Sequence, residues 1–361
     1  MLDPEDIDRL ELTVVLIGLA IGVVLGWISR FANFCTLGAI SDWYSSGDQS
    51  RLRMWLLAIA VAILGTQALI AADLIVVKDA FYTAPRFFWL SYLVGGLMFG
   101  FGMALSSGCG GRNLVRIGGG SLKAIVVFMV MAIFAYMAMR GIFGVMRVNT
   151  VEQIFVTFGT RQDLPSLLRQ PGIIVASLIG LALLAYVFLS QELRRQPRLI
   201  AGGVIIGLLV VAGWITTGNI GFIEEDPNTL ESRFLATNTR GIESLTFVAP
   251  LAYWLDLMML WSDTSRGWTF SIATVCGVVL GALIHAVSSK TFRWEGFVDR
   301  ADLARHLIGA ALMGVGGVTA FGCTIGQGIT GLSLLALGSL VATAAIVAGG
   351  WLGLHWLERH A

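Results

Sequence analysis

Long stretches without a charged side chain constrain this fold more than any other feature. Several run for about 18 to 24 residues, the length that a helix needs to cross roughly 30 Å of hydrocarbon. Of 361 residues, 56% are apolar and 13% charged, whereas a soluble domain is about half apolar and about a quarter charged. The chain is therefore predicted to be an all-α polytopic membrane protein, folded as one membrane domain over residues 1–361.

Nine stretches are predicted to span the membrane: residues 12–30, 53–77, 88–106, 120–142, 170–191, 199–217, 268–289, 302–320 and 336–357. Four apolar pieces between them are too short to span, namely residues 35–45, 110–117, 244–261 and 325–334. Interrupted backbone inside a membrane is tolerated only where protein or a water-filled cavity satisfies its polar groups. The four short pieces are therefore predicted to be re-entrant helices that line a path.

One motif, Gly-x4-Gly-x-Gly-x5-Gly-Cys, occurs twice inside this hydrophobic sequence. The copies consist of Gly95, Gly100, Gly102, Gly108 and Cys109, and of Gly309, Gly314, Gly316, Gly322 and Cys323. The tripeptide Gly-Trp-Ile also recurs, at 26–28 and 213–215. The order span, short, span, span, short, span thus occurs twice.

The duplication predicts halves of about 12–142 and 199–357, joined by a linker span at 170–191. An odd linker span places the second half upside down, as in transporters with inverted repeats and a site at mid-membrane. Lys and Arg placement favours an external N-terminus and a cytoplasmic C-terminus. The net charge of +1 shows no nucleic-acid footprint. The four cysteines form no CxxC pair, so neither a metal site nor a cofactor is expected.

Three cysteines each precede a short segment and are the candidate site: Cys35, Cys109 and Cys323. The free N–H groups and dipole of a helix start favour an anion, and a thiol is a soft, polarizable partner for a ligand that presents sulfur. Neighbouring candidates supply close backbone approach or hydrogen bonds, and they are Gly108, Gly322, Arg112, Asn113, Thr324 and Gln327. Glycine is expected there because it adopts positive φ.

Other interpretations stay open for individual residues. A single membrane cysteine is more often a packing residue, and Cys276, in mid-span, is assigned to packing. The repeat partner of Cys35 is Val248, so the path is expected to be asymmetric. Arg112 and Arg116 either attract anions or anchor lipid phosphates. Four acids near segment ends are interpreted as solvated, with proton coupling as the alternative. They are Asp73, Glu243, Asp256 and Asp302.

The chain resembles the YeeE/YedE family of membrane proteins, which includes thiosulfate transporters. The resemblance rests on NFCTLGAISD, GGLMFGFGMALSSGCGGRNLVRIGGGS, SLTFVAP, FRW and GGVTAFGCTIGQGITGLS and covers nearly the whole length. It implies an importer of thiosulfate in a bacterial inner membrane, in contact with lipid, with nine spanning helices and short ones in an hourglass shape. It also implies that Cys35, Cys109 and Cys323 pass the substrate along by transient S–H···S contacts. A small cytoplasmic sulfur carrier of the TusA type is an implied partner, as a separate chain.

Three alternatives to a thiosulfate permease follow from the same residues. One is a membrane sulfurtransferase, in which a low-pKa thiolate takes the sulfane sulfur as a persulfide. Another is a transporter of a different sulfur or selenium species. The last is a scaffold for sulfur enzymes that transports nothing.

Overall fold

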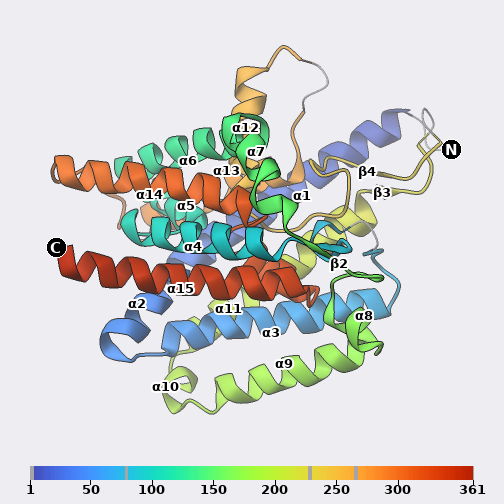
Figure 1. Cartoon of the computed structure of the whole chain (residues 1–361), viewed down its shortest axis with the longest axis horizontal. Coiled ribbons are helices and arrows are strands. Elements are labelled where there is room, and N and C mark those ends of the chain that lie inside the picture. The colour runs from blue at the N-terminus through green and yellow to red at the C-terminus, as the bar shows by residue number, and fades with distance from the viewer. Residues whose placement is uncertain (1–3, 78–79, 227–229, 264–266, 361) are drawn as a thin grey trace.

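The computed structural model describes residues 4–77, 80–226, 230–263 and 267–360, which form a bundle of long helices (Figure 1). The long helices are α1 (Pro4–Phe31), α3 (Ser50–Ala71), α4 (Trp89–Leu105), α6 (Leu122–Arg140), α9 (Gly172–Phe188), α11 (Pro197–Ile215), α13 (Phe270–Ser288), α14 (Arg300–Thr319) and α15 (Leu337–His360). A helix therefore lies at each of the nine predicted positions. Seven helical segments of the described chain are long and apolar enough to cross a membrane, which confirms a multi-pass, all-α membrane protein.

The long helices α9 and α14 are not among these seven segments, one because of its length and the other because of its charged residues. α9 is apolar but has only 17 residues, and the first turns of α14 carry Arg300, Asp302 and Arg305. Both helices nevertheless expose large apolar side chains, with Leu178 on α9 at 73% and Ile308 on α14 at 56% exposure. Apolar surface of this kind is suited to lipid rather than to water.

All four short pieces predicted between the spans are helical. They are α2 (Thr36–Ser46), α5 (Gly110–Gly118), α12 (Ala249–Met259) and the π-helical turn η4 (Gly326–Gly331). A second π-helical turn, η3 (Thr216–Ile220), extends α11. Such turns are uncommon and often occur at functional sites.

The remaining elements are short and lie between the long helices, most of them within residues 142–168 and 222–234. They are the helices η1 (Phe81–Thr83), α7 (Ile142–Asn149), η2 (Val151–Gln153), α8 (Leu164–Leu168) and α10 (Gln191–Arg194), and the strands β1 (Arg86–Phe87), β2 (Val156–Thr157), β3 (Phe222–Ile223) and β4 (Arg233–Phe234). β1 pairs antiparallel with β2, and β3 with β4. The N- and C-termini lie at opposite ends of the bundle (Figure 1).

The repeated glycines bring α4 and α14 together. A Cβ at Gly102 would lie 2.6 Å from the carbonyl oxygen of Gly309, and one at Gly309 would lie 2.6 Å from that of Gly102. Further along the crossing, a Cβ at Gly95 would lie 2.7 Å from the carbonyl oxygen of Gly316. This register makes the two helices antiparallel. Small residues allow such close backbone approach between membrane helices, so these glycines serve packing.

The second glycine of each motif, Gly100 or Gly314, faces a helix outside the α4–α14 pair. A Cβ at Gly100 would lie 2.1 Å from the carbonyl oxygen of Ile346 on α15, and one at Gly314 would lie 2.7 Å from that of Met131 on α6. The two copies therefore have matching neighbours. Elsewhere α1 packs against α13, and α11 packs against α3.

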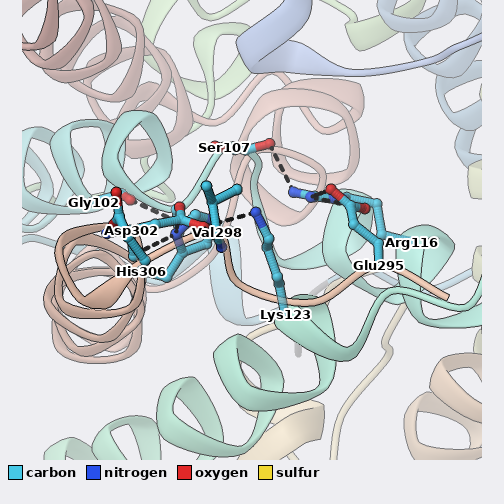
Figure 2. A network of polar contacts seen from close by, with 10 residues as sticks. Gly102, Ser107, Arg116, Lys123, Glu295, Val298, Asp302 and His306 are labelled. Carbon is cyan, nitrogen blue, oxygen red and sulfur yellow. Dashed lines mark hydrogen bonds and ion pairs between the residues drawn. The ribbon is translucent and has the colours of Figure 1, made fainter. Parts of the chain in front are cut away.

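The interpretation of the acids as solvated helix ends is wrong for three of them, because Glu243, Asp256 and Asp302 are buried. Asp302 accepts a hydrogen bond from Lys123 Nζ at 2.7 Å and pairs with His306 Nδ1 at 3.0 Å (Figure 2). A buried charge needs such partners. This cluster ties the start of α14 to the start of α6.

Candidate functional site

The three candidate cysteines share one local structure. A long helix ends, a residue two positions before the cysteine adopts a left-handed conformation, and a helical segment follows. The left-handed residues are Asn33 (φ 52°), Ser107 (φ 56°) and Phe321 (φ 58°). Non-glycine residues rarely adopt this region, and they concentrate at functional sites. The expectation that glycine supplies the positive φ is wrong at Gly108, because Ser107 takes that conformation instead.

Backbone N–H groups at the helix starts face two of the thiols. Cys35 Sγ accepts from the Gly38 N–H at 3.3 Å, and Cys323 Sγ accepts from the Gly326 N–H at 3.4 Å. Cys109 is the N-cap residue of α5. These sulfur atoms therefore lie at positive helix ends, as the sequence predicts.

The thiols form a series through the interior, and all three cysteines are buried. Cys35 and Cys109 line one small cavity, whose wall includes Ile325 from the loop of Cys323. Gly322, which precedes Cys323, lines a different cavity together with Tyr82. The loop of Cys323 therefore lies between Tyr82 and the cavity of Cys35 and Cys109. Cys276 lies on α13 and is half-buried.

Two candidate amides hold the cysteine loops in place. Asn113 Nδ2 donates to the Gly108 carbonyl oxygen at 3.1 Å, and Gln327 Nε2 donates to that of Ala320 at 2.7 Å. Gln327 Oε1 also accepts from Ser339 Oγ at 2.6 Å, so both ends of that side chain are engaged. Gln327 is therefore a positioning residue. Asn113 Oδ1 is buried and has no hydrogen-bond partner among the described residues, which leaves it available.

A cavity of about 270 Å³, here called the Glu243 cavity, lies on the Tyr82 side of Cys323. Its polar lining includes Tyr82, Arg147 and Glu243, and its wall reaches Gly322. The sequence reasoning did not assign these three side chains to a site. The one available signal was an acid next to an interrupted apolar segment, since Glu243 directly precedes the SLTFVAP piece.

Glu243 is held by three hydrogen bonds. Its Oε1 accepts from the backbone N–H groups of Asn238 (2.7 Å) and Thr239 (2.6 Å), and its Oε2 accepts from Ser271 Oγ (3.3 Å). Burial nevertheless raises the pKa of the Glu243 carboxyl, because desolvation outweighs these hydrogen bonds. A carboxyl that takes up a proton at a higher pH than a solvated glutamate does therefore lines this cavity.

A second cavity, the cysteine cavity, contains both Cys35 and Cys109 and has a volume of only about 10 Å³. Phe247 and Ile325 are part of its wall. A cavity of this size holds about one water molecule. Thr246, next to Phe247, and Gly322, in the same loop as Ile325, line the Glu243 cavity. These two loops therefore separate the Glu243 cavity from the cysteine cavity.

Arg112 lies at the other end of the cysteine cavity. It lines both that cavity and a larger one that contains Arg30 and Arg116. Within the described residues, no acid pairs with the half-buried Arg112 guanidinium. A guanidinium without an acidic partner is suited to bind an anion bidentately. The structure thus brings together Cys35, Cys109, Cys323, Arg112 and Thr324.

A family model described as sulphur transport matches residues 31–352. The chain belongs to this sulphur transport family. It is 27% identical over 354 residues to the "Thiosulfate transporter TsuA" of Escherichia coli (strain K12), covering 96% of this chain and 92% of the relative. It is 24% identical over 344 residues to the "Thiosulfate transporter TsuA" of Spirochaeta thermophila, covering 92% of this chain and 96% of that relative. These matches confirm the predicted YeeE/YedE membership.

Proposed function

We propose that this member of the sulphur transport family imports intact thiosulfate and passes it along Cys323, Cys109 and Cys35 in that order. The observation that carries this proposal is the series of three buried thiols between two larger cavities. The names of both relatives support thiosulfate as the substrate. Uptake of labelled thiosulfate by proteoliposomes that contain the purified protein tests it.

The chemistry of the site suits a sulfur-containing dianion that must not be trapped. Each thiol can donate a weak S–H hydrogen bond to the terminal sulfur of thiosulfate. The helix starts at Gly38 and Gly326 add partial positive charge. The Thr324 hydroxyl is buried without a hydrogen-bond partner among the described residues and can donate to an oxygen of the substrate. Such weak, successive sites allow an ion both to bind and to leave.

The cavity sizes support an hourglass in a closed state. The cysteine cavity is about 10 Å³ and lies between cavities of about 270 Å³ and 580 Å³. Thiosulfate is larger than one water, so the loops with Phe247 and Ile325 must move for it to pass.

The packing supports an inverted repeat with nine spans. Exchanging the two halves converts the α1–α13 pair into α11–α3 and the α4–α15 pair into α14–α6, and all four pairs pack together. An odd number of spans agrees with termini at opposite ends of the bundle (Figure 1). α10, which ends in Arg194 and is followed by Arg195 and Arg198, lies at the same end as the C-terminus (Figure 1). This placement favours a cytoplasmic C-terminus and an external N-terminus in a bacterial inner membrane. A TusA-type carrier would receive the sulfur compound at that end.

We predict that uptake increases several-fold as the external pH falls through the raised pKa of Glu243. Ionised Glu243 repels an incoming dianion, and protonation, which its raised pKa favours, removes that charge. Thiosulfate itself stays dianionic in this range. Arg147, Tyr82 and Tyr253 also line the cavity, and Arg147 is paired with Glu152, so Glu243 supplies the proton-dependent charge. Initial rates in proteoliposomes measure the effect.

The matched variant is Glu243→Gln, since the amide keeps the two backbone hydrogen bonds and can donate to Ser271 Oγ. Its uptake should be high and independent of pH. An unchanged pH profile in this variant would assign the dependence to another group.

The sulfurtransferase alternative predicts a covalent product. After exposure to thiosulfate, mass spectrometry of the purified protein should find Cys109 and Cys323 unmodified if thiosulfate passes intact. A lasting gain of one sulfur atom on either residue would instead favour the alternative.

A further inference from the structure

The largest of these cavities, here called the basic cavity, lies where α5, the loop after it, and the 290–295 loop meet. Its volume is about 580 Å³. Its charged lining consists of Arg30, Arg112, Arg116, Lys290, Arg293 and Glu295. Five basic side chains thus share with one carboxylate a cavity that is open to solvent on the side of Lys290 and Arg293.

Backbone hydrogen bonds give this cavity a fixed wall. The Arg293 N–H donates to the Gly119 carbonyl oxygen at 3.3 Å, and the Glu295 N–H donates to that of Gly120 at 3.2 Å. Arg30 Nη2 donates to Thr291 Oγ1 at 3.1 Å. Segments that are far apart in the sequence are therefore joined around the cavity.

The one carboxylate is already engaged. Arg116 Nη2 donates to Glu295 Oε1 at 3.4 Å, and Arg116 Nη1 donates to the Ser107 carbonyl oxygen at 3.5 Å (Figure 2). No acid among the described residues pairs with Arg30, Arg112, Lys290 or Arg293. Like charges that line one cavity repel one another, and a bound dianion would relieve that repulsion.

A buried hydroxyl points to the same ligand. Ser121 is 3% exposed and lines the basic cavity, and its Oγ has no hydrogen-bond partner in the part of the chain that the structure describes. Leaving a buried hydroxyl unsatisfied costs free energy. An oxyanion in the cavity would accept a hydrogen bond from this hydroxyl.

We propose that the basic cavity is a second binding site, for a tetrahedral oxyanion held by Arg112, Lys290, Arg293 and Ser121. Guanidinium groups bind such oxygens in pairs, and the hydroxyl adds one more donor. If the basic cavity is the last binding site on the transport path, that role rests on the proposed function, whereas the binding of an oxyanion does not. The same chemistry fits a free anion, such as thiosulfate or sulfate, and the phosphate of an anionic lipid.

Calorimetry with delipidated protein in detergent tests the proposal, using sulfate as the ligand. Cys109→Ala is used as the background, so that binding is measured with the cysteine path interrupted. We expect sulfate to bind this protein. Adding Lys290→Gln and Arg293→Gln should weaken binding roughly tenfold or more, since a hydrogen bond from a charged group contributes about that much. Ser121→Ala should weaken it several-fold.

The matched control is Arg195→Gln, which removes an exposed arginine of the basic α10 region that does not line the cavity. It should bind sulfate as the background does. Native mass spectrometry of the undelipidated proteins distinguishes the sources. A phospholipid retained by the control and lost from the Lys290→Gln/Arg293→Gln variant identifies a lipid phosphate as the occupant. The proposal is overturned if neither sulfate nor lipid binding differs between that variant and the control. Failure of thiosulfate uptake alone would contradict only the proposed function.

Discussion

Replacing Cys109 or Cys323 by alanine is expected to reduce thiosulfate uptake to background while the protein still folds. Each thiol is buried, and the two occupy consecutive places in the series. Alanine removes both the S–H donor and the polarizable sulfur. Because the sites act in sequence, the loss of one interrupts the path regardless of the others. Initial uptake rates in proteoliposomes, with the amount of inserted protein measured in parallel, give the result.

Two further substitutions make that result specific. Cys276→Ala should leave uptake close to normal, since Cys276 lies outside the cysteine series. Cys323→Ser keeps a hydroxyl donor but removes the soft sulfur, and its uptake should stay far below that of the unaltered protein. Normal uptake by Cys323→Ala would contradict the proposal that thiosulfate passes along the three cysteines.

The other large effect is expected on stability. Gly102→Ala should lower the free energy of unfolding by about 1–3 kcal/mol, the usual cost of forcing an extra group into a packed core. The new Cβ would lie 2.6 Å from the carbonyl oxygen of Gly309, and backbone there cannot yield without separating α4 from α14. Thermal unfolding in detergent, followed by fluorescence, measures the change as a lower transition temperature.

The glycine contact is reciprocal, which supplies an internal check. Gly309→Ala should cost about as much as Gly102→Ala, and the double variant should cost less than the sum, because one separation of the helices relieves both clashes. Gly159→Ala is the matched control, since a Cβ there would meet nothing within 4 Å. Equal transition temperatures for Gly102→Ala and Gly159→Ala would contradict the packing role of the motif.

The long helices and the short interrupted pieces were predictable because both follow from local length and hydrophobicity. The placement of Cys35, Cys109 and Cys323 at helix starts was also predictable, since each follows a break in an apolar stretch. The left-handed residues before them were not, because Ser107 and Phe321 adopt this conformation in response to their helix ends rather than to a turn-forming sequence.

Features that depend on long-range contact were not predictable. The repeated glycines suggested a shared site, whereas the structure divides each motif into helix-crossing glycines and a terminal cysteine. The sequence indicates a solvated Glu243, whereas the structure buries it. Its surroundings include Ser271, which lies on α13, far away in the sequence, and no local pattern reveals that contact. The basic cavity likewise depends on Arg293 meeting the loop after α5, which no local pattern indicates.

Uptake of doubly labelled thiosulfate tests the central claim most directly. The two sulfur atoms carry different isotopes, and the contents of proteoliposomes are analysed after a short exposure. Transport of the intact anion predicts both labels inside in a one-to-one ratio, in chemically unchanged thiosulfate. Arrival of only one label would contradict this account and favour sulfur transfer through a cysteine, and the absence of both would contradict transport itself.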